Sequence, residues 1–154
     1  MRRSILVLLA ALLVPGAASA HVTVWPRQSG LGERERYVIR APNEKRVATL
    51  RIEAQFPPEV RVTSFEQKPG WKIEPRRDAA GAIVGAAWSG ELAPDQFAEF
   101  GVMAVNPKAG ETLTWTFTQV YADGSQVRWS GPPGSATPAP QVRLLPFAAG
   151  EGRR

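Results

Sequence analysis

The large side chains of this sequence recur with a period of two, and no other feature of the chain limits its fold more. From Thr112 to Tyr121, leucine, tryptophan, phenylalanine, glutamine and tyrosine occupy the odd positions, and threonine or valine occupies the even ones. From Val47 to Phe56, apolar residues that include Leu50 and Ile52 alternate in the same way with mostly polar ones. Such alternation is typical of a strand with one buried face, and no comparable stretch has helical spacing. We therefore expect an all-β protein.

Further short segments resemble strands and are separated by glycine, proline, asparagine and aspartate. Short strands about 8–12 residues apart are the pattern of a β-sandwich or a β-barrel. The expected strands are Val22 to Trp25, Arg34 to Arg40, Val60 to Phe65, Trp71 to Glu74, Ile83 to Trp88, Phe97 to Val105, Val127 to Trp129 and Gln141 to Leu145.

Two connections can be predicted from their residue types. Asp123-Gly124 lies between two strand-like runs and predicts a hairpin with a two-residue type I′ turn, in which both residues have positive φ. The segment Gly131 to Pro140 contains four prolines, which lack the N–H groups that a sheet interior requires. We expect this segment to be a loop that precedes the last strand.

Composition excludes several classes of protein. The net charge is only +5, and basic residues such as Arg27, Arg34, Arg51, Arg61 and Arg128 are scattered among acidic ones, so we expect solvated strand faces and no nucleic-acid partner. The chain has no cysteine, which excludes disulfides and thiolate metal sites. A stable fold must therefore come from packing.

The beginning of the chain has the pattern of a signal peptide. Arg2 and Arg3 precede an apolar run from Ile5 to Val14 that is too short to span a bilayer, and Ala18-Ser19-Ala20 has the small residues of a cleavage site. We expect residues 1–20 to be a cleaved signal peptide and the mature protein to be exported, periplasmic or secreted, and soluble. His21 would then be the first residue.

The remaining residues divide into one domain and a tail. Residues 21–146 are enough for a single domain with a hydrophobic core and too few for two. Residues 147–154 contain no apolar stretch that could cross a membrane, so we expect a disordered tail and no membrane anchor in the mature chain.

His21 is the only histidine in the sequence. As an N-terminal residue it would offer its α-amino group and ring Nδ1 to one metal ion, although an ordinary surface or capping residue is the commoner fate of a lone histidine. Two nitrogens with a carboxylate oxygen suit tetragonal Cu(II), whereas Cu(I) prefers sulfur and Met103 is the only methionine of the mature chain. We therefore expect Cu(II) if His21 binds a metal.

Hydrolytic catalysis has little support in the residues. A serine triad would need His21 as its base, and no serine stands in a G-x-S-x-G motif. Paired carboxylates stay open as an alternative, because acidic residues are available, but their spacing does not single out a pair.

The mature chain resembles the YcnI-like family of exported copper-binding domains over residues 21 to about 145. The similarity rests on many motifs in the same order. They are HVTVWP from His21, Ala41-Pro42-Asn43-Glu44 after Tyr37 and before Thr49, Phe56-Pro57, Pro69-Gly70-Trp71, Trp88-Ser89-Gly90, Glu99-Phe100, Gln119 with Tyr121-Ala122-Asp123-Gly124, and Trp129-Ser130-Gly131.

The resemblance implies a single antiparallel β-sandwich of immunoglobulin or cupredoxin-like type that holds Cu(II) in a single-histidine brace. His21 and Glu44 match the family's ligands, and Trp129 matches the tryptophan beside the site. From the residues alone, Glu44 would be a turn acid and Trp129 equally a core aromatic. Trp25 is close enough to His21 in sequence to line the same site. We expect the other tryptophans, Trp71, Trp88 and Trp115, to be core residues.

The favoured function is binding of Cu(II) for copper homeostasis, meaning acquisition, delivery or detoxification, with another copper-handling protein as a partner of the delivery role. One alternative is a redox enzyme of the histidine-brace type, which the lack of a second histidine disfavours. Another is a metal-free interaction module, which would need only the sandwich.

Overall fold

The computed structural model describes residues 21–146. The predicted signal peptide, residues 1–20, and the predicted disordered tail, residues 147–154, lie outside the described residues. Every regular element between His21 and Pro146 is a β-strand, so the all-β prediction is confirmed.

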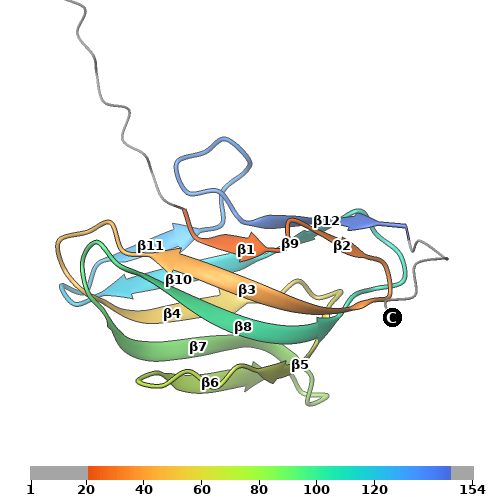
Figure 1. The fold of residues 1–154 in the computed structure, drawn as a ribbon, viewed down its shortest axis with the longest axis horizontal. Helices are drawn as coiled ribbons and strands as arrows, with labels where there is room; N and C mark the ends of the chain where they lie inside the picture. Colours follow the sequence, from red (N-terminus) through yellow and green to blue (C-terminus); the bar gives the residue numbers. More distant parts are fainter. Residues whose placement is uncertain (1–20, 147–154) are drawn as a thin grey trace, which may run out of the picture.

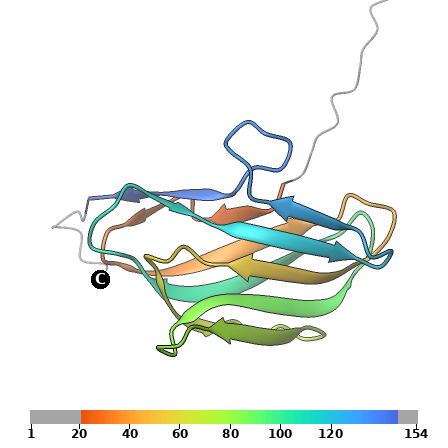
Figure 2. The same cartoon turned by 180° about the vertical axis from the view of Figure 1, so that it is seen from behind.

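Three sheets make up the fold (Figures 1 and 2). A four-stranded sheet has the order β1-β3-β8-β5 and lies against a five-stranded sheet with the order β11-β10-β4-β7-β6. A three-stranded sheet, β2-β12-β9, continues the sandwich at one end. The strands are β1 Thr23–Trp25, β2 Gln28–Gly30, β3 Arg34–Pro42, β4 Thr49–Gln55, β5 Arg61–Phe65, β6 Lys72–Arg77, β7 Ile83–Leu92, β8 Phe97–Val105, β9 Thr112–Thr114, β10 Thr116–Tyr121, β11 Gln126–Trp129 and β12 Gln141–Leu145.

The core lies between the two larger sheets and is rich in aromatic rings. Trp88 and Trp115 are fully buried, as predicted, and Trp71 is half-buried and packs against the core with its ring 4.9 Å from that of Phe100. Tyr37 continues the aromatic cluster, 5.0 Å from Trp115. Because the chain has no disulfide, this packing is the main source of its stability.

The alternating run from Thr112 to Tyr121 forms strands with one buried face, as predicted, but its two halves belong to different sheets. All five of its odd residues are buried. The run divides at Trp115, so that β9 pairs with β12 and β10 pairs with β4 and β11. Trp115 stands between them and donates its backbone N–H to the Pro140 carbonyl at 2.9 Å.

In the second alternating run, the structure differs from the prediction at Leu50. The pattern predicts its side chain on the buried face, but Leu50 is 41% exposed and Thr49 is buried. A bulge causes this difference, because the register of β4 against both β7 and β10 skips Leu50. The bulge turns Thr49 into the interior, where its hydroxyl meets Gln119.

The hairpin at Asp123-Gly124 is confirmed, whereas the predicted turn type is wrong. Only Gly124 has positive φ, at 80°, and its N–H donates to the Tyr121 carbonyl at 2.9 Å. A three-residue loop with one left-handed residue therefore replaces the two-residue turn. The Asp123 carboxylate accepts hydrogen bonds from the backbone N–H and the hydroxyl of Ser125.

β2 was not predicted from the sequence. Gln28-Ser29-Gly30 lacks apolar alternation, and its partner is β12, with which it pairs in parallel. The segment Gly131 to Pro140 is a loop, as predicted, and projects from the sandwich between β11 and β12 (Figures 1 and 2).

Candidate metal centre

His21 lies at the end of the sandwich where β3 finishes. The ladder between β1 and β3 ends with Thr23 opposite Arg40. His21 is two residues before Thr23, and Pro42 is two residues after Arg40. Because the strands are antiparallel, both segments leave the ladder at the same end. The segment Pro42-Asn43-Glu44 therefore follows β3 beside the segment that carries His21.

The imidazole of His21 packs on the indole of Trp129. Their ring centroids are 5.5 Å apart, with 59° between the ring planes. Trp129 is the last residue of β11, is only 5% exposed, and belongs to the hydrophobic core. Trp129 is therefore a core aromatic that also contacts His21, and its role beside a metal stays a prediction.

Gln119 connects Trp129 with the chain that leads to Glu44. This glutamine is fully buried on β10. Its side-chain N–H group donates to the Pro42 carbonyl at 2.9 Å and to the Thr49 hydroxyl at 2.8 Å. Its side-chain oxygen accepts the Trp129 indole N–H at 3.4 Å. One buried amide thus forms hydrogen bonds both with Trp129, which contacts His21, and with Pro42, which precedes Glu44.

Glu44 is exposed on the turn that follows β3. Asn43 fixes this turn, because its buried amide donates to the carbonyls of Val47, at 2.9 Å, and Leu92, at 3.0 Å. Burial, and after it the negative charges of Glu44 and Asp123, raise the pKa of Tyr121 above its ordinary value of 10.0. The charge of Glu44 thus affects the ionisation of Tyr121, at the end of β10.

The cation next to Glu44 contacts the β10–β11 hairpin. The Lys45 ammonium group donates to the Ser125 hydroxyl at 2.8 Å and lies 4.1 Å from the centroid of the Tyr121 ring. These contacts hold the turn after β3 against the hairpin.

A small cavity of about 220 Å³ opens beside His21. One wall is formed by His21, Val22, Thr23 and Arg27 at the beginning of the domain. The other wall belongs to the proline-rich loop and the start of β12, with Pro133, Pro138, Ala139, Pro140 and Gln141. The proline-rich loop thus borders the space next to the imidazole.

The donor set around His21 limits how a metal could be held. Within residues 21–146, no three side chains of histidine, cysteine, aspartate or glutamate come together at one point. A site made of such side chains alone does not exist in this part of the chain. If His21 binds a metal, donors other than these side chains have to complete the site, and an α-amino group at His21 would be one such donor. A chelate of that α-amino group and the His21 ring would not depend on a cluster of side chains.

Trp25 is not among the residues that line the cavity beside His21. Its side chain is 43% exposed, and the Arg27 guanidinium carbon lies 4.7 Å from its ring centroid.

Gln119 is the residue that sequence reasoning missed. The available signal was a polar residue on the buried face of an alternating strand.

Comparison with known families matches residues 21–144 to the family described as "Domain of unknown function (DUF1775)", so the match begins at His21. The chain belongs to this YcnI-like family. It is 34% identical over 129 residues to a relative from Bacillus subtilis (strain 168) named "Copper-binding protein CutI". The alignment covers 82% of this chain and 63% of the relative, so the chain spans less than two thirds of that protein.

Solved structures agree with the fold. A protein from Nocardia farcinica, described as having an immunoglobulin-like fold, is 29% identical with a TM-score of 0.71 and covers 80% of this chain and 97% of its own. A cohesin module from Clostridium perfringens is 12% identical with a TM-score of 0.52, covering 83% of this chain and 100% of its own, and shows the fold alone. The predicted antiparallel sandwich of immunoglobulin-like type is confirmed, with β2–β12 as a parallel exception.

Among residues 21–146, there is no helix of the length and apolar character needed to cross a membrane.

Proposed function

We propose that this protein is exported and binds Cu(II) at His21 and Glu44 in the service of copper homeostasis, through acquisition, delivery or detoxification. The observation that carries the proposal is the packing of the His21 ring on Trp129 at the end of the sandwich where the Pro42-Asn43-Glu44 segment emerges. The copper-binding name of the Bacillus subtilis relative supports copper as the metal.

Each residue of the site has a distinct role in this proposal. The α-amino group and Nδ1 of His21 would chelate the ion, and the Glu44 carboxylate would add an anionic oxygen that neutralises part of its charge. An indole N–H is a donor with no lone pair for a metal, so Trp129 would act as a wall that orients the imidazole and limits the access of water.

Binding is favoured over turnover by the number of nitrogen ligands. Brace-type redox sites employ a second histidine, and His21 is the only histidine of the sequence. The Bacillus subtilis relative is named for copper binding, and the Nocardia farcinica protein is described by its immunoglobulin-like fold. Delivery to another copper-handling protein is part of the proposal.

Export is proposed because the brace requires cleavage after Ala20. The Ala18-Ser19-Ala20 pattern supports cleavage at that bond, and so does a family match that begins at the next residue. A periplasmic or secreted, soluble protein would follow.

The test is a comparison of two N-termini. Protein that begins at His21 and protein that begins Gly-Ser-His21 are titrated with Cu(II) while electron paramagnetic resonance spectra are recorded. We expect one tightly bound Cu(II) with nitrogen coupling in the first protein, and weaker binding with a different spectrum in the second. Equal affinity and identical spectra would overturn the brace. Mass spectrometry of protein recovered from an exporting host locates the cleaved bond, and cleavage at another position would also contradict the proposal.

A further inference from the structure

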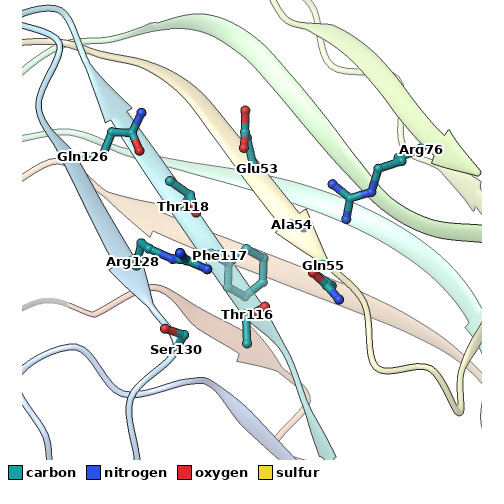
Figure 3. A pocket seen from close by; sticks show the side chains of 10 residues that line it. All are labelled: Glu53, Ala54, Gln55, Arg76, Thr116, Phe117, Thr118, Gln126, Arg128 and Ser130. Carbon is teal, nitrogen blue, oxygen red and sulfur yellow. The ribbon is translucent and has the colours of Figure 1, made fainter.

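The outer face of the five-stranded sheet carries a hollow of about 340 Å³ that lies apart from the candidate copper site (Figure 3). Its lining comes from β4, β6, β10 and β11 and from Ser130, just after β11. We name it the sheet hollow and define it by Glu53, Ala54, Gln55, Arg76, Thr116, Phe117, Thr118, Gln126, Arg128 and Ser130.

Strand register explains why these residues share one face. Residues directly opposite one another on paired strands point to the same side of a sheet. Two adjacent rows therefore cross the outer face. One runs through Thr116, Gln55, Gly85 and Arg76, and the other runs through Arg128, Thr118, Glu53 and Ala87.

Gly85 of β7 leaves room for the side chain of Arg76. A Cβ atom added to Gly85 would lie 2.5 Å from Nη2 of Arg76, so the Arg76 guanidinium rests directly over this glycine. In Figure 3, Arg76 enters from one side and Arg128 from the other, with the side chains of β4 and β10 between them. Two guanidinium groups thus border one polar depression.

In the described part of the chain, these two guanidinium groups lack a partner for hydrogen bonding. Within residues 21–146, neither guanidinium group forms a hydrogen bond or an ion pair, although the backbones of Arg76 and Arg128 are paired within the sheet. The carboxylate of the hollow, Glu53, pairs instead with Arg51 at 2.7 Å. The pKa of Arg51 is raised because Glu53 and Glu74 accept its hydrogen bonds. The negative charge of Glu53 is thereby offset, and the positive charge of the two arginines is not.

The other polar groups of the hollow can also donate hydrogen bonds. Hydroxyl groups come from Thr116, Thr118 and Ser130, and amides from Gln55 and Gln126. The one aromatic residue of the lining, Phe117, has its ring buried in the core, so the hollow offers no exposed ring on which a neutral sugar could stack. Guanidinium groups surrounded by neutral donors are suited to carboxylate oxygens.

We propose that the sheet hollow binds a ligand with two or more carboxylates, one group recognised by Arg76 and another by Arg128. The arginines belong to β6 and β11, the two edge strands of the sheet, and β10, β4 and β7 lie between them, so a ligand that contacts both must extend over the middle of the sheet. Such carboxylates could belong to a free polycarboxylate or to aspartate and glutamate side chains of an extended peptide.

This site is separate from the copper proposal. Trp129 points into the core toward His21, whereas its neighbours Arg128 and Ser130 line the hollow on the outer face of the same strand. The test is performed on metal-free protein, so its outcome does not depend on whether His21 binds copper.

The experiment follows amide chemical shifts and affinity in two titrations. One uses citrate, and the other uses an acetylated and amidated hexa-aspartate peptide, with hexa-asparagine as the neutral control. We expect shift changes at Gln55, Thr116, Thr118 and Arg128. Binding of citrate alone would assign the site to a free polycarboxylate, and tighter binding of hexa-aspartate would assign it to an acidic peptide.

Charge-matched double variants distinguish the hollow from general attraction. Arg76→Gln/Arg128→Gln removes the two guanidinium groups, while Arg34→Gln/Arg61→Gln removes two exposed arginines from the four-stranded sheet. We expect the first pair to lower the affinity about tenfold or more, and the second to change it less than about twofold. Equal losses in both pairs, shift changes outside the hollow, or no binding of either probe at millimolar concentration would overturn the proposal.

Discussion

Trp129 donates its indole N–H to the side-chain oxygen of Gln119 across 3.4 Å, inside the core and directly behind the imidazole of His21. The same amide holds the carbonyl of Pro42, two residues before Glu44. The position of the aromatic wall and the start of the turn after β3 are therefore set by one side chain.

Gln119→Leu should weaken both the fold and the candidate site. The apolar side chain leaves the Pro42 carbonyl, the Thr49 hydroxyl and the Trp129 indole without this partner, and an unsatisfied buried polar group costs about 1–3 kcal/mol. Urea denaturation of the metal-free protein should show a loss of at least that size. Gln28→Leu, at an exposed glutamine of β2, is the control and should stay within about 0.5 kcal/mol of the parent. A Gln119→Leu protein as stable as this control would contradict the proposed network.

Glu44→Gln should lower the affinity for Cu(II) without changing the stability of the metal-free protein. The amide has nearly the size of the carboxylate but lacks the anionic oxygen, and residue 44 is exposed. Competition titrations with a copper chelator measure the affinity, and Glu59→Gln, at another exposed loop glutamate, should leave it unchanged. An unaltered affinity and spectrum in Glu44→Gln would remove this residue from the ligand set.

Trp129→Phe should change the stability and the copper spectrum together. The smaller ring leaves a gap in the core that costs about 1–3 kcal/mol, and it also alters the wall on which the imidazole packs. Trp88→Phe is the matched control, because Trp88 is a fully buried tryptophan of β7. It should lose comparable stability with the spectrum of Cu(II) unchanged. If both variants kept the parental spectrum, Trp129 would be a packing residue only.

Alkaline pH should destabilise the protein through Tyr37. Burial, as the largest cause, raises the pKa of this phenol above its ordinary value of 10.0. The neutral hydroxyl donates to Oδ1 of Asn106 at 2.7 Å. Above pH 10 the unfolded chain releases the phenol proton while the folded chain keeps it. The contribution of Tyr37 to the free energy of unfolding is therefore fully present below pH 10 and is lost as the pH rises through the raised pKa.

Urea denaturation between pH 8 and pH 11 measures this dependence. In Tyr37→Phe the free energy of unfolding should be lower at pH 8, because Asn106 loses its donor, yet it should fall less steeply above pH 10. The pKa of Tyr121 is also raised, so some alkaline dependence should remain. An unchanged slope in Tyr37→Phe would show that Tyr37 does not couple folding to proton release.

The fold could be predicted because most of its strands have a local signature. The odd positions from Thr112 to Tyr121 are buried as the alternation indicates, and the Asp123-Gly124 hairpin joins the strands it was expected to join. Leu50 was assigned to the wrong face because a bulge depends on how β7 and β10 align with β4, which local alternation does not encode. β2 was missed for a similar reason, since only its pairing with β12 makes it a strand.

The metal-binding roles at the candidate site stay predictions. His21 was selected from the cleavage pattern, and Glu44 and Trp129 from the family resemblance. Gln119 was visible as a polar residue on a buried face, but its partners lie some seventy or more positions away in Pro42 and Thr49. The sheet hollow had no signature in the sequence, because Arg76 and Arg128 look like any exposed strand arginines until the sheet places them around one depression.

The parallel pairing of β2 with β12 has a consequence for the order of folding. Strands from opposite ends of the described chain must meet, and contacts between distant segments form slowly because a long loop has to close first. Because a chain is synthesised from its N-terminal end, β1 can pair with β3 early, while Trp129 and β12 become available much later. The pocket around His21 is therefore completed only when the last strands arrive, and metal loading of this site would follow folding rather than guide it.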